Sequence, residues 1–244
     1  MLNMVDSKLM TIREVAEYLG VSLMTLRRWD KSGKLPAIRK PGGHRYYERG
    51  QVEAFNEDLF SLARVWVSSE VPPDISSKYY CQTQDSFRAR HEKMALFMKG
   101  RTSVDILSLV TAIAGEIGNN SFDHNLGNWP DVLGIFFGYD LNRRVVILAD
   151  RGVGIRETLS RVRADLKDDL GALNVAMTER ISGRSPEQRG NGLKFVTKVA
   201  NENPIGITLQ SGVAVATIKK EKRAQLKIGL ADRNIRGVLA KIEY

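Results

Sequence analysis

Apolar residues recur at helical spacing in the middle of the chain, over residues 105–124. Ile106, Val110, Ile113 and Ile117 fall on one arc at about 100° per residue. Such an arc is typical of an amphipathic helix that turns one face towards a core. The pattern therefore predicts a core-facing helix over this stretch.

The C-terminal part of the chain shows further runs of strand and helix character. Runs rich in β-branched and aromatic residues predict strands. The strand candidates are residues 132–139, 144–149, 207–212, 213–220 and 238–244. The other helix candidates are residues 87–99 and 190–201. Together they predict a mostly antiparallel sheet of about five or more strands, with helices on one face.

Near the N-terminus the pattern predicts two short amphipathic helices separated by a tight turn. Thr11 and Glu14 form a capping box before the first helix. Ser22 can cap the second helix, which ends at Gly33. Two short extended runs on either side of residues 41–43 predict a β-wing. This order of elements is that of a winged helix-turn-helix.

Charge is concentrated in the same N-terminal stretch. The whole chain of 244 residues carries a formal charge of +9, from 37 basic and 28 acidic residues. Residues 27–49 alone hold eight Lys and Arg against two acids, Asp30 and Glu48. This basic patch favours a polyanionic partner, because clustered cations attract phosphate backbones.

The cysteine content, the N-terminal residues and the lengths of the apolar stretches indicate in which cellular compartment the protein works. Cys81 is the single cysteine, which excludes an internal disulfide framework and favours a reducing cytosol. The N-terminus has no signal-peptide pattern. The longest apolar stretch, around residues 106–114, is too short and too interrupted to span a bilayer. We therefore expect a cytoplasmic protein without a membrane partner.

A few polar residues and glycines stand out within the C-terminal pattern. Glu116 and Asn120 lie one turn apart beside the apolar arc, and inward-facing polar groups are costly unless a partner satisfies them. Asp150 ends a strand candidate and is followed by glycines, so its carboxylate can accept a hydrogen bond from a flat ring near the backbone. Gly190 and Gly192 open a helix candidate, where N–H groups and the helix dipole favour phosphate.

Each feature alone also has a plain structural interpretation. Polar residues beside an apolar arc occur at solvated helix edges, and a lone DxGxG occurs in any tight turn from strand to helix. The third glycine of a Rossmann fingerprint is missing after Gly154. No GxxxxGK[ST] loop occurs in the sequence. It is the combination of the segments that favours a nucleotide site.

In order and spacing, four segments resemble the GHKL superfamily with its Bergerat ATP-binding fold, a histidine-kinase-like ATPase domain. They are EIGNN (116–120), DRGVGI (150–155), SGRSPEQRG (182–190) and GNGL (190–193). The resemblance covers roughly residues 90–244 and implies ATP and Mg²⁺ as cofactors. Asn191 stands where the family usually has another glycine.

The resemblance also implies a role for each matching residue. Glu116 would be the general base that orients the attacking water, Asn120 would bind Mg²⁺ and the nucleotide, and Asp150 would read the adenine amino group. The other implied nucleotide-binding residues are Gly152, Gly154, Gly190, Gly192, Leu193 and Lys194. Residues 156–189 would form a flexible lid, with Arg180, Arg184 and Arg189 as further phosphate contacts.

The N-terminal segment closely resembles the winged helix-turn-helix of the MerR and excisionase type. The resemblance rests on LGVS (19–22), TLRRWDKSGKL (25–35) and PGGHRYY (41–47). It implies that the second helix enters the major groove of double-stranded DNA while the wing contacts the backbone or minor groove. The implied DNA contacts are Thr25, Arg27, Arg28, Arg39, Lys40, His44, Arg45 and Tyr46. Trp29 is assigned to the core of this domain.

These observations predict an α+β protein of two domains. After a short disordered lead at residues 1–10, residues 1–62 as a whole form the winged helix-turn-helix, 63–86 a linker, and 87–244 a two-layer α/β sandwich of the Bergerat type. The expected function is an ATP- and DNA-binding regulator and slow Mg²⁺-dependent ATPase, active as a homodimer. Two alternatives remain open: an anti-sigma-type serine/threonine protein kinase acting on a protein partner, and an ATP sensor without hydrolysis.

Overall fold

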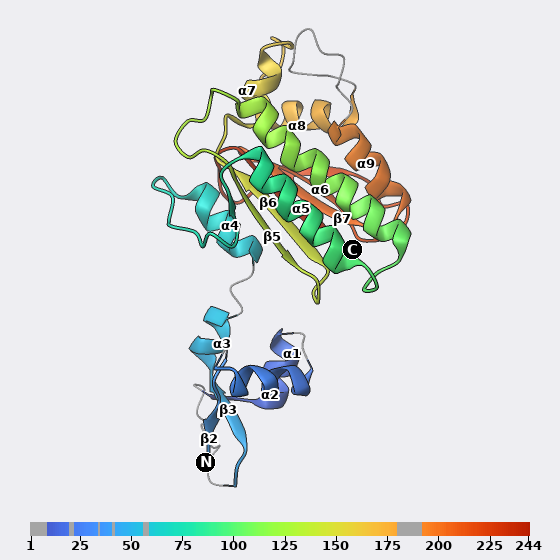
Figure 1. Ribbon diagram of the computed structural model, residues 1–244. Coiled ribbons are helices and arrows are strands. Elements are labelled where there is room, and N and C mark those ends of the chain that lie inside the picture. Colours follow the sequence, from blue (N-terminus) through green and yellow to red (C-terminus); the bar gives the residue numbers. More distant parts are fainter. Residues whose placement is uncertain (1–8, 20–21, 34, 41, 56–58, 180–191) are drawn as a thin grey trace, which may run out of the picture. The chain divides into compact units, whose positions relative to one another are not determined.

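The computed structural model describes residues 9–19, 22–33, 35–40, 42–55, 59–179 and 192–244. The chain divides into two compact units, Met1–Asp58 and Leu59–Tyr244 (Figure 1). Both mix helices and antiparallel strands, so the protein is of the α+β class. No helix in the described ranges has both the length and the apolar character needed to cross a bilayer.

The first unit contains the two predicted helices and the predicted wing. Its elements are β1 (Leu9–Thr11), α1 (Ile12–Leu19), α2 (Leu23–Lys31), β2 (Ile38–Arg39), β3 (Arg45–Glu48) and α3 (Arg49–Phe55). The capping box is confirmed, because the Thr11 N–H donates to Glu14 Oε2 at 2.6 Å and the Glu14 N–H to Thr11 Oγ1 at 3.3 Å. Ser22 caps α2 by accepting the Thr25 N–H at 3.1 Å.

A small hydrophobic core holds the first unit together. It contains Met10, Val15, Leu19, Leu26, Leu35, Tyr47 and Val52. Met10 is buried because β1 pairs with β3, so the expectation of a disordered lead is wrong for residues 9 and 10. Trp29 is partly buried and packs against this core from its edge.

The second unit is built around one seven-stranded sheet. Its strands are β4 (Tyr80–Cys81), β5 (Ile135–Asp140), β6 (Val145–Asp150), β7 (Gly206–Ser211), β8 (Ala214–Ile218), β9 (Lys227–Leu230) and β10 (Val238–Glu243). Their order is β4-β5-β6-β10-β7-β8-β9, with every neighbouring pair antiparallel. The five predicted strands are present. The sequence did not reveal β4, which is two residues long, or β9, which is largely exposed.

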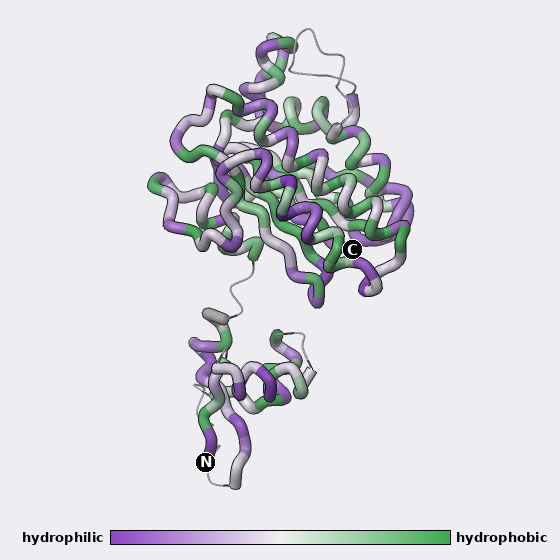
Figure 2. The backbone as a smooth tube through the Cα atoms, viewed as in Figure 1, coloured by the Kyte–Doolittle hydropathy of each residue, from purple (hydrophilic) through white to green (hydrophobic). Residues whose placement is uncertain are grey.

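Helices cover both faces of this sheet, whereas the sequence predicted helices on one face. The helices are α4 (Leu59–Ser68), α5 (Gln84–Met98), α6 (Val104–Asn125), α7 (Gly154–Ser160), α8 (Asp169–Thr178) and α9 (Gly192–Glu202). α5, α6 and α9 lie side by side across one face (Figure 1). Hydropathy alternates along α5 and α6, as expected for helices with one buried side (Figure 2).

The opposite face is covered by α4, which occupies part of the predicted linker 63–86. Ala63, Trp66 and Val67 are buried against the sheet residues Phe136, Val145, Ile147, Ala149 and Leu239. The linker prediction fails because these apolar side chains find a partner face that lies far away in the sequence. The predicted lid is also partly wrong, since α7 and α8 occupy much of residues 156–189 and α8 buries Ala172, Leu173, Val175 and Met177.

A fully buried arginine fastens the end of α4 to the sheet. Arg151, directly after β6, is 0% exposed. Its guanidinium donates to the carbonyls of Trp66, of Ser69 (2.9 Å) and of Glu70 (3.3 Å), which close the C-terminal end of α4. Its Nε and Nη2 atoms also donate to Asp131 Oδ2, at 3.0 Å and 2.5 Å. Charge and hydrogen-bonding capacity are thereby satisfied together, as a buried guanidinium requires.

We expect Arg151→Met to lower the free energy of unfolding by about 3–5 kcal/mol, because the change leaves the buried carbonyls and one side of Asp131 without their donors. The matched control is Arg64→Met on α4, whose pair with Asp232 is 3.6 Å long and solvent-exposed. That variant should lose less than about 1 kcal/mol. Urea unfolding of both variants measures the difference, and equal losses would contradict the anchoring role of Arg151.

Candidate functional site

The exposed side of α2 carries cationic side chains in the first unit. Arg27 and Arg28 are exposed, and no hydrogen bond or ion pair involves their side chains within the described part of the chain. The Thr25 hydroxyl lies 3.0 Å from that of Ser22 and so helps to cap the helix. Thr25, Arg27 and Arg28, which the sequence assigns to the major groove, therefore share one helix.

The wing is a two-stranded hairpin whose turn contains Gly42 and Gly43, both with positive φ. Lys40 and His44 are exposed beside this turn. The Lys40 ammonium lies 4.9 Å from the ring centroid of half-buried Tyr46. All five predicted wing residues thus belong to β2, β3 or the turn between them. Pro41 lies outside the described residues.

Asp30, near the end of α2, connects the helix with the wing. One carboxylate oxygen accepts the Ala37 N–H at 3.0 Å. The other accepts Arg45 Nε at 2.6 Å and Arg39 Nη2 at 3.2 Å. The Ala37 hydrogen bond, followed by the Arg45 guanidinium, holds the pKa of Asp30 below its ordinary value. Two of the predicted DNA contacts are therefore also ion-paired within the protein.

In the second unit, α6 brings Glu116 and Asn120 against the start of α9. Both side chains are half-buried, and no hydrogen bond to either side chain is present among the described residues. A Cβ atom on Gly192 would lie only 1.9 Å from Glu116 Oε1 and 3.0 Å from Asn120 Nδ2. Glycine lets the helix start come this close without displacing the Glu116 carboxylate, so the helix start and the two polar side chains form one cluster.

Asp150 is held against α6 at Ser121, the residue that follows Asn120. It is 1% exposed, and its carboxylate accepts the Ser121 hydroxyl at 2.7 Å and the Gly152 N–H at 2.9 Å. Burial raises the pKa of Asp150 to about 6, against the opposing effect of these hydrogen bonds and of the Val238 N–H and the Asn125 amide. A carboxylate so placed orders its own turn, because the Gly152 N–H and the Ser121 hydroxyl both donate to it.

The turn after Asp150 is fixed to α6 and to β7. The Val153 N–H donates to Asn125 Oδ1 at 2.9 Å, and Asn125 in turn donates to the Ser121 carbonyl at 2.7 Å. A Cβ on Gly152 would lie 2.1 Å from the Asn125 amide, so a glycine is required here as well. On the other side the Ile155 N–H donates to Ser211 Oγ at 3.0 Å.

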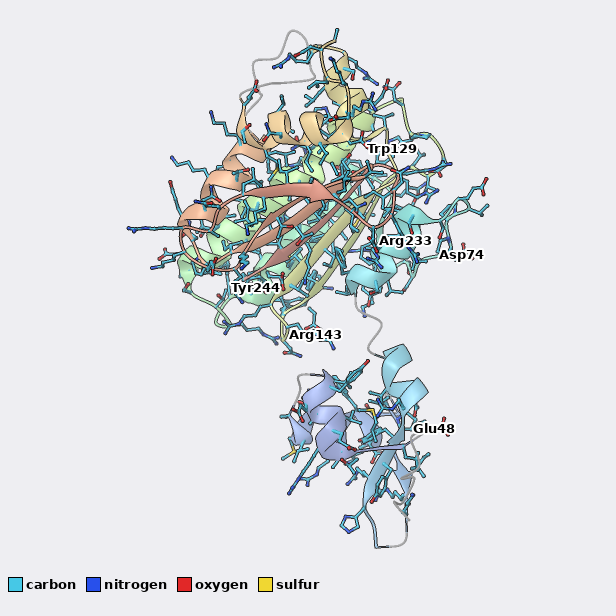
Figure 3. The ribbon with its side chains drawn as sticks, turned by 180° about the vertical axis from the view of Figure 1, so that it is seen from behind. Glu48, Asp74, Trp129, Arg143, Arg233 and Tyr244 are labelled. Atoms are coloured by element: carbon cyan, nitrogen blue, oxygen red, sulfur yellow. The ribbon has the colours of Figure 1, made fainter. Side chains whose placement is uncertain are left out.

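Glu116 and Asn120 thus lie on α6, and Asp150 with its turn is hydrogen-bonded to the same helix. From Glu116 to Asn125 the axial rise along α6 is about 13 Å. Asp150 lies at the end of β6 that pairs with Ile135 and Val238, away from the end at which Val145 pairs with Asp140 and Glu243. In Figure 3, Trp129 lies far from Arg143 and Tyr244 in the second unit. Leu193 packs against the main core and Lys194 is exposed. Gly190, Asn191, Arg180, Arg184, Arg189 and the segment 182–190 lie outside the described residues.

The part of the chain that the structure describes holds no group of three or more His, Cys, Asp or Glu side chains suited to a metal ion. This agrees with the donor set around Asn120, which offers an amide oxygen and one neighbouring carboxylate. Mg²⁺ is commonly bound by one or two protein oxygens together with substrate phosphates and water. The residues present fit a metal that arrives with a nucleotide.

Sequence reasoning missed several residues that organise these sites. Asp30 was counted only as an acid within a basic window, and Ser121, Asn125 and Ser211 were not singled out. One signal was available for α6: Ser121 and Asn125 are polar and one turn apart, on the side of the helix that also carries Ile117. The partner of Ser211 lies more than fifty residues away in the sequence, so no local pattern indicates it.

Comparison with known proteins identifies the first unit. A family model described as a helix-turn-helix domain matches residues 9–58. The Type II methyltransferase M.Eco47II of Escherichia coli is 39% identical over 67 residues, which are 27% of this chain and 16% of that protein. The chain therefore carries an N-terminal helix-turn-helix domain of the DNA-binding kind. Its match spans about a sixth of the methyltransferase.

We expect the stability of the protein to report the titration of Asp150. The folded-state pKa, about 6, lies above the ordinary value of 3.8. The folded state thus holds the proton more tightly, and the resulting stability is complete below about pH 3.8 and lost as the pH rises to about 6. Asp150→Asn cannot ionise, so its stability should lack this pH dependence, while its single acceptor oxygen serves fewer of the surrounding donors at every pH.

Relative to the wild type, the free energy of unfolding of Asp150→Asn should therefore fall as the pH drops from 7.5 to 4, by on the order of 3 kcal/mol at most, measured by denaturant unfolding. Asp74→Asn is the matched control, because Asp74 is exposed in a loop. It removes the same charge and should show no such pH dependence. A constant difference between Asp150→Asn and the wild type would contradict a protonation cost at this position.

Proposed function

We propose that the protein is an ATP- and DNA-binding regulator, a slow Mg²⁺-dependent ATPase whose nucleotide state modulates DNA binding. The observation that carries the nucleotide half is the cluster of Glu116, Asn120 and Gly192. Two half-buried polar side chains without a hydrogen-bond partner among the described residues face the start of a helix. Half-buried polar groups that no described residue engages are available to hydrogen-bond an incoming ligand beside the N–H groups of the helix start.

The chemistry of these residues suits a nucleoside triphosphate. The N–H groups at the start of α9 favour phosphate oxygens. In the proposal the Glu116 carboxylate orients a water molecule and takes its proton, while the Asn120 amide oxygen coordinates the Mg²⁺ that arrives with the phosphates. Bound Mg²⁺ would neutralise phosphate charge. The buried Asp150 carboxylate accepts a hydrogen bond from the adenine amino group.

The resemblance of the four sequence segments to the GHKL superfamily supports the same assignment. In that proposal the sheet with α5, α6 and α9 on one face is a Bergerat-type two-layer sandwich. Gly152 and Gly154 shape the adenine end, and Gly190, Gly192, Leu193 and Lys194 surround the phosphates. Homodimer formation is part of the proposal as well, because paired helix-turn-helix units suit paired half-sites.

For the DNA half, we propose that α2 lies in the major groove and the wing along the phosphate backbone. Arg27 and Arg28 are exposed with all their donors available to base edges or phosphates. Arg39, Lys40 and Arg45 supply charge along the wing. Thr25, His44 and Tyr46 complete the proposed contact surface.

The proposed coupling between the two halves uses α4. This helix begins at Leu59, the first residue of the second unit, so it follows the helix-turn-helix unit directly in the chain. Its C-terminal end is held by Arg151, the neighbour of the adenine-reading Asp150. The Arg236 N–H donates to the Val67 carbonyl at 3.0 Å and strengthens the same anchor. A nucleotide that shifts the turn at Asp150 would therefore shift the helix that follows the helix-turn-helix unit in the chain.

The two alternatives make different products from ATP. A protein kinase of the anti-sigma type transfers label from γ-labelled ATP to a protein in a partner extract, whereas an ATPase releases labelled free phosphate. A pure sensor does neither, although ATP with Mg²⁺ still raises the melting temperature of the protein. The methyltransferase match is too short to bring that enzyme's activity into the proposal.

We expect Glu116→Gln to keep the ATP-dependent rise in melting temperature while its phosphate release falls about 100-fold or more, because a general base typically contributes that factor. Asp150→Asn should instead lose the rise in melting temperature. The matched control Glu92→Gln changes an exposed carboxylate on α5 and should alter neither. Unchanged phosphate release in Glu116→Gln would remove the general-base assignment, and absence of any ATP-dependent shift in the wild type would sink the nucleotide proposal.

We also expect Arg45→Ala to weaken binding to a short mixed-sequence duplex. The plot of log affinity against log salt should become shallower by about one unit, because one phosphate contact disappears. Fluorescence anisotropy at several salt concentrations measures both quantities. Lys198→Ala is the control, since Lys198 is exposed on α9 of the second unit and its loss removes the same charge. If Arg45→Ala behaves like this control, the wing does not contact DNA.

A further inference from the structure

The wing contains a pair of like charges that needs an explanation. Arg39 on β2 and Arg45 on β3 are direct cross-strand partners. Side chains of directly opposite residues point to the same face of a hairpin, and like charges in this arrangement are destabilising. The β2 strand is only two residues long, so little other strand pairing is available to offset that repulsion.

Asp30 supplies the missing counter-charge. Its Oδ2 atom accepts Arg45 Nε at 2.6 Å and Arg39 Nη2 at 3.2 Å. The Asp30 side chain is 10% exposed, and that of Arg45 is 24% exposed. Partly shielded ion pairs are weakened less by solvent and salt than exposed ones. One carboxylate thus balances both arginines and joins both strands of the wing to α2.

The same carboxylate fixes the loop that leads into the wing. Asp30 Oδ1 accepts the Ala37 N–H at 3.0 Å, just before β2 begins. The carboxylate therefore has one oxygen on the backbone of the loop and the other on the two guanidinium groups. This arrangement sets both the position of the wing and the direction of its arginines relative to α2.

The contacts leave the outer donors of the wing available. Arg45 uses Nε on Asp30, so neither of its terminal nitrogens is engaged by this carboxylate. Arg39 uses one terminal nitrogen and is 59% exposed. A guanidinium has five N–H donors. Because some of them are already fixed on Asp30, the others are oriented before DNA binds, and less side-chain entropy is lost on binding.

We infer that Asp30 is a positioning residue for DNA binding, which holds Arg39 and Arg45 side by side so that both reach the phosphate backbone. The inference rests on the DNA-binding role of the wing proposed above. It reverses the simple electrostatic expectation, because Asp30 is an acid within a basic surface. On charge alone, its removal would tighten the complex with DNA.

The test compares Asp30→Asn with Glu17→Gln in the full-length chain. Both changes remove one negative charge from the first unit, but Glu17 is exposed on α1 and forms no hydrogen bond or ion pair with the wing among the described residues. The asparagine amide has one acceptor oxygen and cannot serve both the Ala37 N–H and Arg45. The probe is a mixed-sequence duplex of about 25 base pairs, and affinity is measured at several salt concentrations.

We expect Asp30→Asn to bind about tenfold more weakly than Glu17→Gln at moderate salt, with a salt dependence up to about two units shallower, because two phosphate contacts are impaired. Equal or tighter binding by Asp30→Asn, with the salt dependence unchanged, would overturn the inference. Failure of the wild type to bind the duplex at all would instead remove the DNA-binding proposal itself.

A double-mutant cycle separates positioning from general loss of structure. If Asp30 acts through Arg45, adding Asp30→Asn to Arg45→Ala should weaken binding much less than it does in the wild type. Independent effects that simply add would contradict a role through Arg45. Circular dichroism and the melting temperature of each variant show whether the first unit is folded, and Asp30→Glu, which keeps the charge, should recover part of the affinity.

Discussion

The second unit depends on two neighbouring residues at the end of β6 that point to opposite faces of the sheet. Successive side chains of a strand alternate between faces. Asp150 turns towards α6, where it accepts the Ser121 hydroxyl. Arg151 turns towards α4, where it donates to the carbonyls at the end of that helix. One dipeptide thereby fastens a helix to each side of the sheet.

The two residues meet the cost of burial in different ways. The Asp131 carboxylate balances the charge of Arg151, and carbonyl oxygens accept its remaining donors. Asp150 has no cationic partner among its contacts, only hydroxyl, amide and N–H donors, and burial raises its pKa to about 6. In a buried ion pair each partner compensates the desolvation of the other charge. A buried carboxylate without a cationic partner keeps that desolvation cost whenever it is ionised. Burial of Asp150 is therefore costly in its ionised form, whereas burial of Arg151 is compensated by its partners.

Local chemistry made much of the fold predictable from the sequence. The capping pairs Thr11–Glu14 and Ser22–Thr25 are three residues apart, and they place the starts of α1 and α2 without any tertiary information. The arc from Ile106 to Ile117 likewise predicts α6. Glu116, Asn120 and Gly192 were singled out from their positions in such elements, and the structure brings these three together.

Long-range pairing accounts for what the sequence did not reveal. The segment after Leu59 has no obvious period, and Trp66 and Val67 are buried only because strands more than sixty residues later form their partner face. Arg151 contacts carbonyls 81–85 residues away in the chain. Asp30 shows the same limit over a shorter span, since its partners Arg39 and Arg45 are nine and fifteen residues away. A count of charges in the sequence registers Asp30 only as one negative charge in a basic segment. The structure shows that this carboxylate holds two arginines.

Asp30 and Asp150 share a physical principle, although they belong to different units. Each carboxylate accepts a backbone N–H from a turn and a side-chain donor from another element. Each therefore fixes a turn relative to a helix: the wing relative to α2 in one case, and the glycine turn relative to α6 in the other. The difference is charge. Asp30 faces arginines and its pKa is lowered, while Asp150 faces neutral donors and its pKa is raised. Asp30 thus arranges two cations through its negative charge, whereas Asp150 arranges neutral donors at a site where burial disfavours that charge.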